Sequence, residues 1–205
     1  MKHIFIGLVV AGMIATSCSN NENTTTSDNR NADISSDSMV DQSHNMDTSM
    51  AIASSGKIDM TAPDAPMAFA SDAASGSMME ITLAEYAQKN AASAAVKSYA
   101  SMLHKDHTNA SEKLKTLASR KNMTLPSTMG AEKQEMVNRL ITLKGADFDR
   151  EYMAMMVEDH NKEVMKFQDA AHMLADPDLK NFAAENVMVL REHLTKARQI
   201  KDGLK

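Results

Sequence analysis

Cysteine, tryptophan and aromatic residues in general are scarce in this chain of 205 residues. It has one Cys, no Trp and only 4% aromatic residues. A single Cys excludes an intramolecular disulfide and a cysteine-based zinc site. The few aromatics, with seven Gly and four Pro, argue against a β-sandwich or barrel, which needs β-branched and aromatic strands joined by frequent turns.

A long hydrophobic run is also missing from the N-terminus. Lys2 precedes an apolar stretch at residues 4–14, which is too short to span a bilayer of roughly 30 Å as a helix. Small residues at 15–17 lead to Cys18, an arrangement that resembles a bacterial lipoprotein lipobox. We therefore predict a signal peptide over residues 1–17 and a lipidated Cys18 that anchors the chain to a membrane. The alternative is an ordinary cleaved signal with an incidental Cys.

Net charge is modest and unevenly distributed. The formal net charge is −5 at pH 7, which argues against nucleic acid as a partner. Residues 19–66 carry eight acids and two bases and no aromatic residue. Such a segment cannot bury enough apolar surface to offset the entropy of ordering it. We therefore predict that residues 18–66 are a disordered acidic linker, which holds residues 67–205 away from the membrane.

From residue 67 onward, apolar residues recur every three to four positions, a spacing that predicts helices and no strands. The expected helices cover residues 71–90, 92–121, 131–143 and 147–175, followed by one that starts at Asp176 and Pro177. Asp147 is expected to cap the fourth helix. Four long helices and one short one predict an all-α fold, an antiparallel four-helix bundle with one extra short helix.

Each long helix carries one metal-capable side chain on its apolar stripe, and an acid precedes each histidine. The stripe residues are Glu80, His107, His160 and His193, and the acids are Asp106, Asp159 and Glu192. Adjacent residues lie about 100° apart on a helix, so each acid flanks its histidine and is placed to orient an imidazole through its free ring N–H. This set predicts a site for one divalent metal ion such as zinc, with the three acids in supporting positions. The alternative is a buried polar network that only fixes packing.

Enzyme motifs are not evident. The chain has no Gly-rich phosphate loop and no G-x-S-x-G sequence. The di-iron pattern Glu-x-x-His is missing as well, because His104, Val157 and Leu190 stand three positions before the three histidines. This argues against a ferroxidase, and an enzyme of another kind on the same cluster remains a third possibility.

Residues 67–200 resemble the domain-of-unknown-function 4142 family, often labelled as outer-membrane proteins. The resemblance rests on residues 77–81 (SMMEI), Asp106-His107, 125–126 (LP), 145–153 (GADFDREYM), Asp159-His160 and 190–194 (LREHL). It implies a ferritin-like bundle located in the cell envelope, in the periplasm or at the outer membrane, and it supplies no activity. The expected function is thus a lipid-anchored envelope protein with a metal- or ligand-binding bundle, or else a structural and interaction module of the envelope.

Overall fold

A computed structural model describes residues 57–204, which form five helices and no strand. The helices are α1 (Ala65–Asn90), α2 (Ala94–Arg120), α3 (Ala131–Leu140), α4 (Gly145–Met173) and α5 (Pro177–Gly203). The all-α prediction is confirmed for this part of the chain. The predicted signal peptide, the lipidated Cys18 and the linker as far as residue 56 lie outside the described residues. None of the helices between residues 57 and 204 has the length and apolarity needed to cross a membrane.

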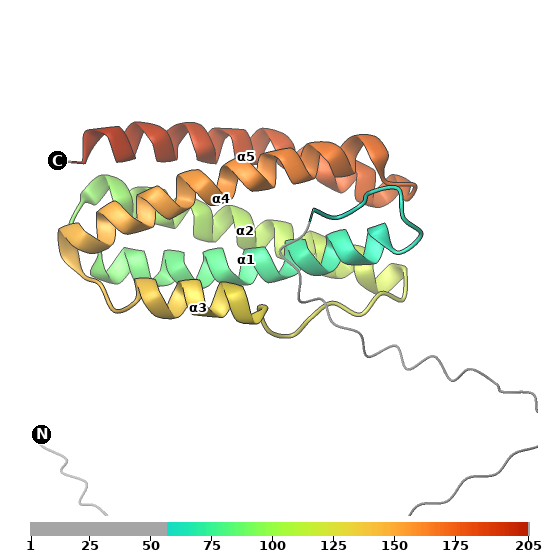
Figure 1. The fold of residues 1–205 in the computed structure, drawn as a ribbon, viewed down its shortest axis with the longest axis horizontal. Coiled ribbons are helices and arrows are strands. Elements are labelled where there is room, and N and C mark those ends of the chain that lie inside the picture. Colours follow the sequence, from blue (N-terminus) through green and yellow to red (C-terminus); the bar gives the residue numbers. More distant parts are fainter. Residues whose placement is uncertain (1–56, 205) are drawn as a thin grey trace, which may run out of the picture. The chain divides into compact units, whose positions relative to one another are not determined.

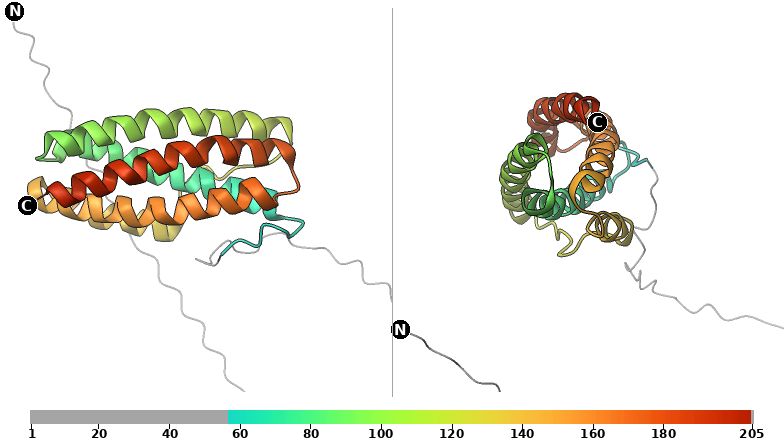
Figure 2. Two further views of the ribbon diagram at one scale, coloured as in Figure 1. Left: turned by 90° about the horizontal axis from the view of Figure 1, so that it is seen from above. Right: turned by 90° about the vertical axis from the view of Figure 1, so that its left-hand side faces the viewer.

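The four long helices form a bundle of two hairpins (Figures 1 and 2). Helix α1 packs along α2, and α4 packs along α5, in each case after a short turn. Helix α2 also lies beside α5, and α1 beside α4, so that each long helix runs antiparallel to its neighbours. The connection from α2 to α4 returns along the length of the bundle and contains α3, which packs outside against α1 and α4. The predicted four-helix bundle is thereby confirmed, and the ferritin-like assignment stays a prediction.

The structure agrees with the predicted start of α5 and differs from the predicted start of α4. Asp176 caps α5 by accepting hydrogen bonds from the backbone N–H groups of Asp178 and Leu179, at 3.1 and 3.0 Å. The expected Asp147 cap of α4 is wrong, because that helix already begins at Gly145. Gly145 has a φ of +60°, a left-handed value that glycine adopts without a steric penalty. Asp147 therefore lies in the first helical turn, where its carboxylate accepts from Arg150.

A buried acid joins the two hairpins at one end of the bundle. The carboxylate of Asp149 in α4 accepts the backbone N–H groups of Ala92 and Ser93, at 3.1 and 2.7 Å. Ser93 is the N-cap of α2 and Ala92 precedes it, so both N–H groups lie outside the hydrogen-bonded part of the helix. Asp149 therefore caps α2 from another helix and fixes the level of α4 against α2.

The packed part of the chain begins earlier than residue 67, which corrects the predicted end of the linker. Met60 is buried in the hydrophobic core, and Ile58 packs against the same cluster. Helix α1 starts at Ala65 with Pro66 in its first turn, a place where the missing N–H of proline costs little. Residues 57–66 thus belong to the folded domain.

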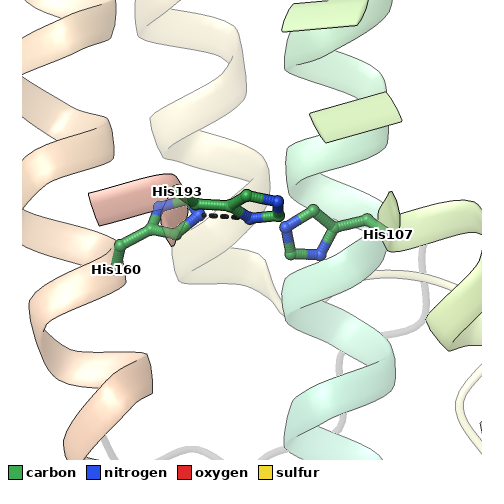
Figure 3. A group of neighbouring side chains, drawn as sticks. All are labelled: His107, His160 and His193. Atoms are coloured by element: carbon green, nitrogen blue, oxygen red, sulfur yellow. Dashed lines mark hydrogen bonds between the residues drawn. The ribbon is translucent and has the colours of Figure 1, made fainter. Parts of the chain in front are cut away.

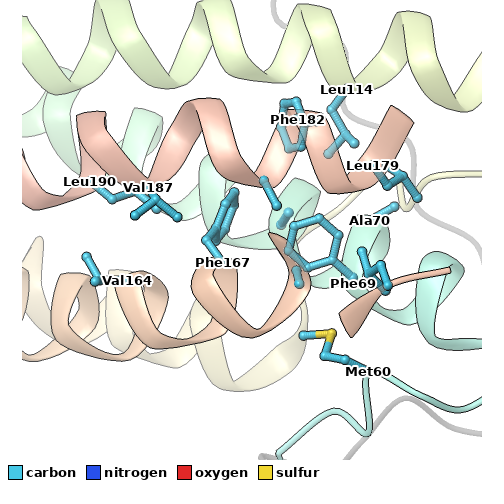
Figure 4. Close-up of a cluster of buried hydrophobic side chains, with 14 of the residues drawn as sticks. Met60, Phe69, Ala70, Leu114, Val164, Phe167, Leu179, Phe182, Val187 and Leu190 are labelled. Atoms are coloured by element: carbon cyan, nitrogen blue, oxygen red, sulfur yellow. The ribbon is translucent and has the colours of Figure 1, made fainter. Parts of the chain in front are cut away.

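The hydrophobic core has two parts. One gathers Phe69, Phe167 and Phe182 in edge-on and tilted contacts, with ring centroids 5.0 to 6.5 Å apart (Figure 4). The other is built around Phe148 and Tyr152, whose rings stack 5.2 Å apart. On α2 and α4 a buried histidine lies between the two parts, and on α5 the buried His193 lies next to Leu194, at the end of the first part. A polar layer therefore divides the apolar core across the bundle.

Candidate metal centre

The polar layer is made by one inward side chain from each long helix. Glu80 of α1 and His160 of α4 are fully buried, His193 of α5 is 1% exposed and His107 of α2 is 6% exposed. Figure 3 shows the three imidazoles turned toward one another from different helices. One ring nitrogen from each histidine lies within 4.8 Å of the others. The structure therefore brings together the four residues named from the sequence, and their binding of a metal ion stays a prediction.

Glu80 joins the imidazoles through both of its oxygens. Its Oε2 lies 2.9 Å from Nδ1 of His107, and its Oε1 lies 3.4 Å from Nε2 of His160. Neither oxygen receives a hydrogen bond, and Nε2 of His107 also has no partner. The short contact to His107 thus brings nitrogen and oxygen together without aligning the N–H with the acceptor. These buried polar atoms are left without the partners that such atoms normally have.

The hydrogen bonds at the rim determine which ring nitrogens hold protons. Nδ1 of His160 lies 3.0 Å from the carbonyl oxygen of Met156, which can only accept, so this nitrogen donates. Nε2 of His193 lies 3.1 Å from a carboxylate oxygen of Asp106 and donates for the same reason. The remaining nitrogens, Nε2 of His160 and Nδ1 of His193, face each other at 3.3 Å (Figure 3). In neutral rings both nitrogens then carry lone pairs that face each other, an arrangement that a bound metal ion would stabilise.

A fifth buried donor, Glu163, was missed from the sequence. It is 7% exposed and lies one helical turn after His160 on α4. Glu80, His160 and Glu163 each offer an atom within 4.8 Å of the other two, and Oε2 of Glu163 has no partner. The spacing His-x-x-Glu was the available signal, since residues three apart share a helix face.

Gly76 of α1 makes room for this carboxylate. A Cβ atom at position 76 would lie 3.0 Å from Oε1 of Glu163, a tighter contact than most real Cβ atoms make. Glycine inside a helix costs roughly 0.5–1 kcal/mol relative to alanine. The close approach of Glu163 gives a physical reason for a glycine at this position.

The flanking acids have three different surroundings. Asp106 contacts the cluster directly through His193 and is 32% exposed, so it lies between the buried imidazoles and solvent. Asp159 has one buried carboxylate oxygen without a partner. Glu192, expected beside its histidine, instead bonds Lys196 at 2.6 Å on the surface. The structure therefore does not bring Glu192 into the cluster. His104 also lies outside it, 3.3 Å from Glu85 in an exposed contact.

Burial and neighbouring charge disfavour ionisation throughout the cluster. Burial, and then the charge of Asp159, raise the pKa of Glu80 well above its ordinary range. Burial, followed by the charges of Glu80 and Asp159, does the same to the pKa of Glu163. The pKa values of His107 and His160 are lowered, chiefly by burial, and burial with the nearby His107 lowers the pKa of His193 to about 4. The imidazoles are therefore neutral near pH 7, which is the form that binds metal ions.

Comparison with known proteins identifies a family but no individual protein that matches the chain. A family model described as Domain of unknown function (DUF4142) matches residues 49–200. No curated protein matches the chain, and no solved structure matches it. The match includes all residues of the buried cluster.

Proposed function

The chain belongs to the DUF4142 family, and we propose that its helical bundle binds one divalent transition-metal ion. The protein ligands are three neutral imidazoles and one carboxylate, from His107, His160, His193 and Glu80. Because each ligand comes from a different long helix, the ion lies in the middle of the bundle, between the two parts of the apolar core.

The spacing of the donor atoms carries this proposal. Ligand atoms about 2.0–2.1 Å from a tetrahedral ion lie roughly 3.3–3.4 Å from one another. Nε2 of His160 lies 3.3 Å from Nδ1 of His193 and 3.4 Å from Oε1 of Glu80. Two edges of the expected tetrahedron are thus present, both formed by atoms with free lone pairs. His107 offers a ring nitrogen within 4.8 Å of the nitrogens of His160 and His193 as the remaining ligand.

The donor types indicate the class of ion. Imidazole nitrogen combined with carboxylate oxygen suits zinc, copper, nickel and ferrous iron. Zinc is the first candidate, because it accepts a closed tetrahedral set and needs no further ligand. The bonds from His160 to Met156 and from His193 to Asp106 support binding, since a partner on the second ring nitrogen fixes the ring and raises the basicity of the first.

The metal content of full-length protein purified without a histidine tag tests this proposal. Wild type is expected to hold about one ion per chain, and the double variant His107→Gln, His160→Gln to hold none. The matched control is His104→Gln, His172→Gln, which removes two solvent-accessible imidazoles and should keep the ion. A stoichiometric metal in the first double variant, or none in wild type after incubation with zinc, would leave only a structural role for the cluster.

We also propose that the chain is a lipoprotein of the cell envelope, anchored through Cys18. The support is the basic Lys2, the short apolar run at residues 4–14 and the small residues before a single Cys. Detergent-phase partitioning of the expressed full-length chain tests this. Wild type should enter the detergent phase and Cys18→Ser the aqueous phase, and equal partitioning of both would refute the anchor.

A further inference from the structure

The cluster contains two overlapping sets of possible ligands. The first is nitrogen-rich and consists of His107, His160 and His193. The second is oxygen-rich and consists of Glu80, His160 and Glu163. All members of both sets are buried, and each set has its ligand atoms within 4.8 Å of one another.

His160 belongs to both sets but can serve only one ion at a time. Its Nδ1 is bonded to the carbonyl oxygen of Met156 at 3.0 Å, so only Nε2 has a free lone pair. A lone pair makes one metal bond. Two ions bound simultaneously, each with His160 as a ligand, are therefore excluded, and the two sets are alternative positions for one ion.

A separate observation, the unpaired carboxylate oxygens, points to a cation at the oxygen-rich position. Glu163 is more than nine-tenths buried, and its Oε2 has no hydrogen-bond partner. Asp159 adds another buried oxygen without a partner. The nearby ammonium groups of Lys133 and Lys166 both pair with Asp72 instead, that of Lys133 at 2.9 Å. The carboxylates are thus left without a hydrogen-bonded counter-ion.

We infer that the bundle holds a single divalent ion in either of two overlapping positions, and that the hardness of the ion decides between them. This inference rests on the proposed metal binding and adds Glu163 as a ligand. Zinc prefers the position with three imidazoles, and manganese the position with two carboxylates and one imidazole, because harder ions favour oxygen ligands. His160 belongs to both sets, and Glu80, which completes the zinc position in the proposed function, is also a ligand in the oxygen-rich position.

Equilibrium dialysis of the full-length protein with Zn²⁺ and with Mn²⁺ tests the inference. Glu163→Gln should weaken Mn²⁺ binding by at least about tenfold, with less than about a threefold effect on Zn²⁺. His193→Gln should weaken Zn²⁺ binding by at least about tenfold and affect Mn²⁺ much less. Glu85→Gln, which removes an exposed carboxylate, is the matched control and should change neither.

A second variant protects the test against misfolding. Gly76→Ala adds a methyl group 3.0 Å from Oε1 of Glu163 and replaces glycine by the best helix former. It should weaken Mn²⁺ binding selectively, as Glu163→Gln does, without removing any ligand.

A competition experiment tests whether the two ions share one site. Zn²⁺ is added to the Mn²⁺-loaded protein, and the electron paramagnetic resonance signal of free Mn²⁺ measures how much Mn²⁺ is displaced. One Zn²⁺ should release one Mn²⁺.

The outcomes separate the two proposals. Zinc binding by wild type that Glu163→Gln and His193→Gln weaken equally, or a bound Mn²⁺ that survives saturation with Zn²⁺, would overturn the inference and leave the proposed function standing. Binding of Zn²⁺ with no measurable binding of Mn²⁺ would also overturn it. If wild type binds neither ion, both proposals fail.

Discussion

Replacing Glu80 by glutamine should stabilise the metal-free bundle and reduce the stabilisation that an added ion provides. Both carboxylate oxygens are buried without hydrogen bonds, and each unsatisfied buried group costs about 1–3 kcal/mol. A glutamine at this position leaves at most one oxygen unpaired, and its amide can donate to a free imidazole nitrogen. We expect a gain of about 1–3 kcal/mol, which is roughly 2–10 °C in Tm for a domain of this size.

In the presence of the ion, Glu80→Gln should have the opposite effect on stability, because it removes one of the ligands. An ion present at 100 times its Kd stabilises the wild-type protein by about 2.7 kcal/mol. If the loss of one ligand weakens binding about 100-fold, the same ion concentration provides only roughly 0.4 kcal/mol. Thermal unfolding followed by circular dichroism, with a chelator and with added zinc, measures both effects. Glu85→Gln is the control, and it should change neither value.

In the absence of metal, Glu80 and His107 are expected to be neutral. The raised pKa of Glu80 and the lowered pKa of His107 indicate two neutral groups at a distance of 2.9 Å. If they formed a true buried ion pair, removing one partner would cost about 3–5 kcal/mol. A loss of that size in the metal-free protein, with an unchanged response to zinc, would refute the metal-site argument and favour a cluster that only fixes packing.

Three further predictions concern the stability of the fold. Phe69→Ala should cost about 3–5 kcal/mol in urea unfolding, because this fully buried ring contacts two others; a loss below about 1 kcal/mol would contradict that. Asp176→Ala should cost about 1 kcal/mol through the lost cap of α5, and Asp176→Asn, which can still cap, should cost less. Burial raises the pKa of Asp72, but Lys166 and Lys133 lower it further, to a net value below the ordinary 3.8. This stabilisation is therefore present above about pH 4 and is lost as the pH falls through the folded-state pKa. Asp72→Asn should cost about 1–2 kcal/mol at pH 7 and progressively less as the pH falls below about 4, and a cost that does not fall with pH would contradict the assignment.

Helical periodicity predicted the bundle well because the apolar stripe of each helix is also the face that it buries. The same stripe located Glu80 and the three histidines, since a polar residue within an apolar stripe must point inward. Helix ends were less predictable. Pro66 was interpreted as lying before the first helix, although it occupies the first turn of α1, where proline is compatible with helix geometry.

The supporting residues depend on tertiary contacts that no local pattern contains. Asp106 and Glu192 each precede a histidine, yet Asp106 bonds His193 on another helix, whereas Glu192 points to solvent and bonds Lys196. Which of the two meets a neighbour is decided by how α2 and α5 pack. Glu163 was missed because the di-iron pattern places its acid three residues before a histidine, and here the acid follows.

The donors are divided between the two hairpins, with Glu80 and His107 on α1 and α2, and His160, Glu163 and His193 on α4 and α5. A truncated or half-assembled chain would offer at most an incomplete set of ligands and would bind the ion much more weakly. Tight binding of an ion would then require both hairpins to be packed together. The metal content of a preparation would therefore report the fraction of molecules in which the two hairpins have assembled.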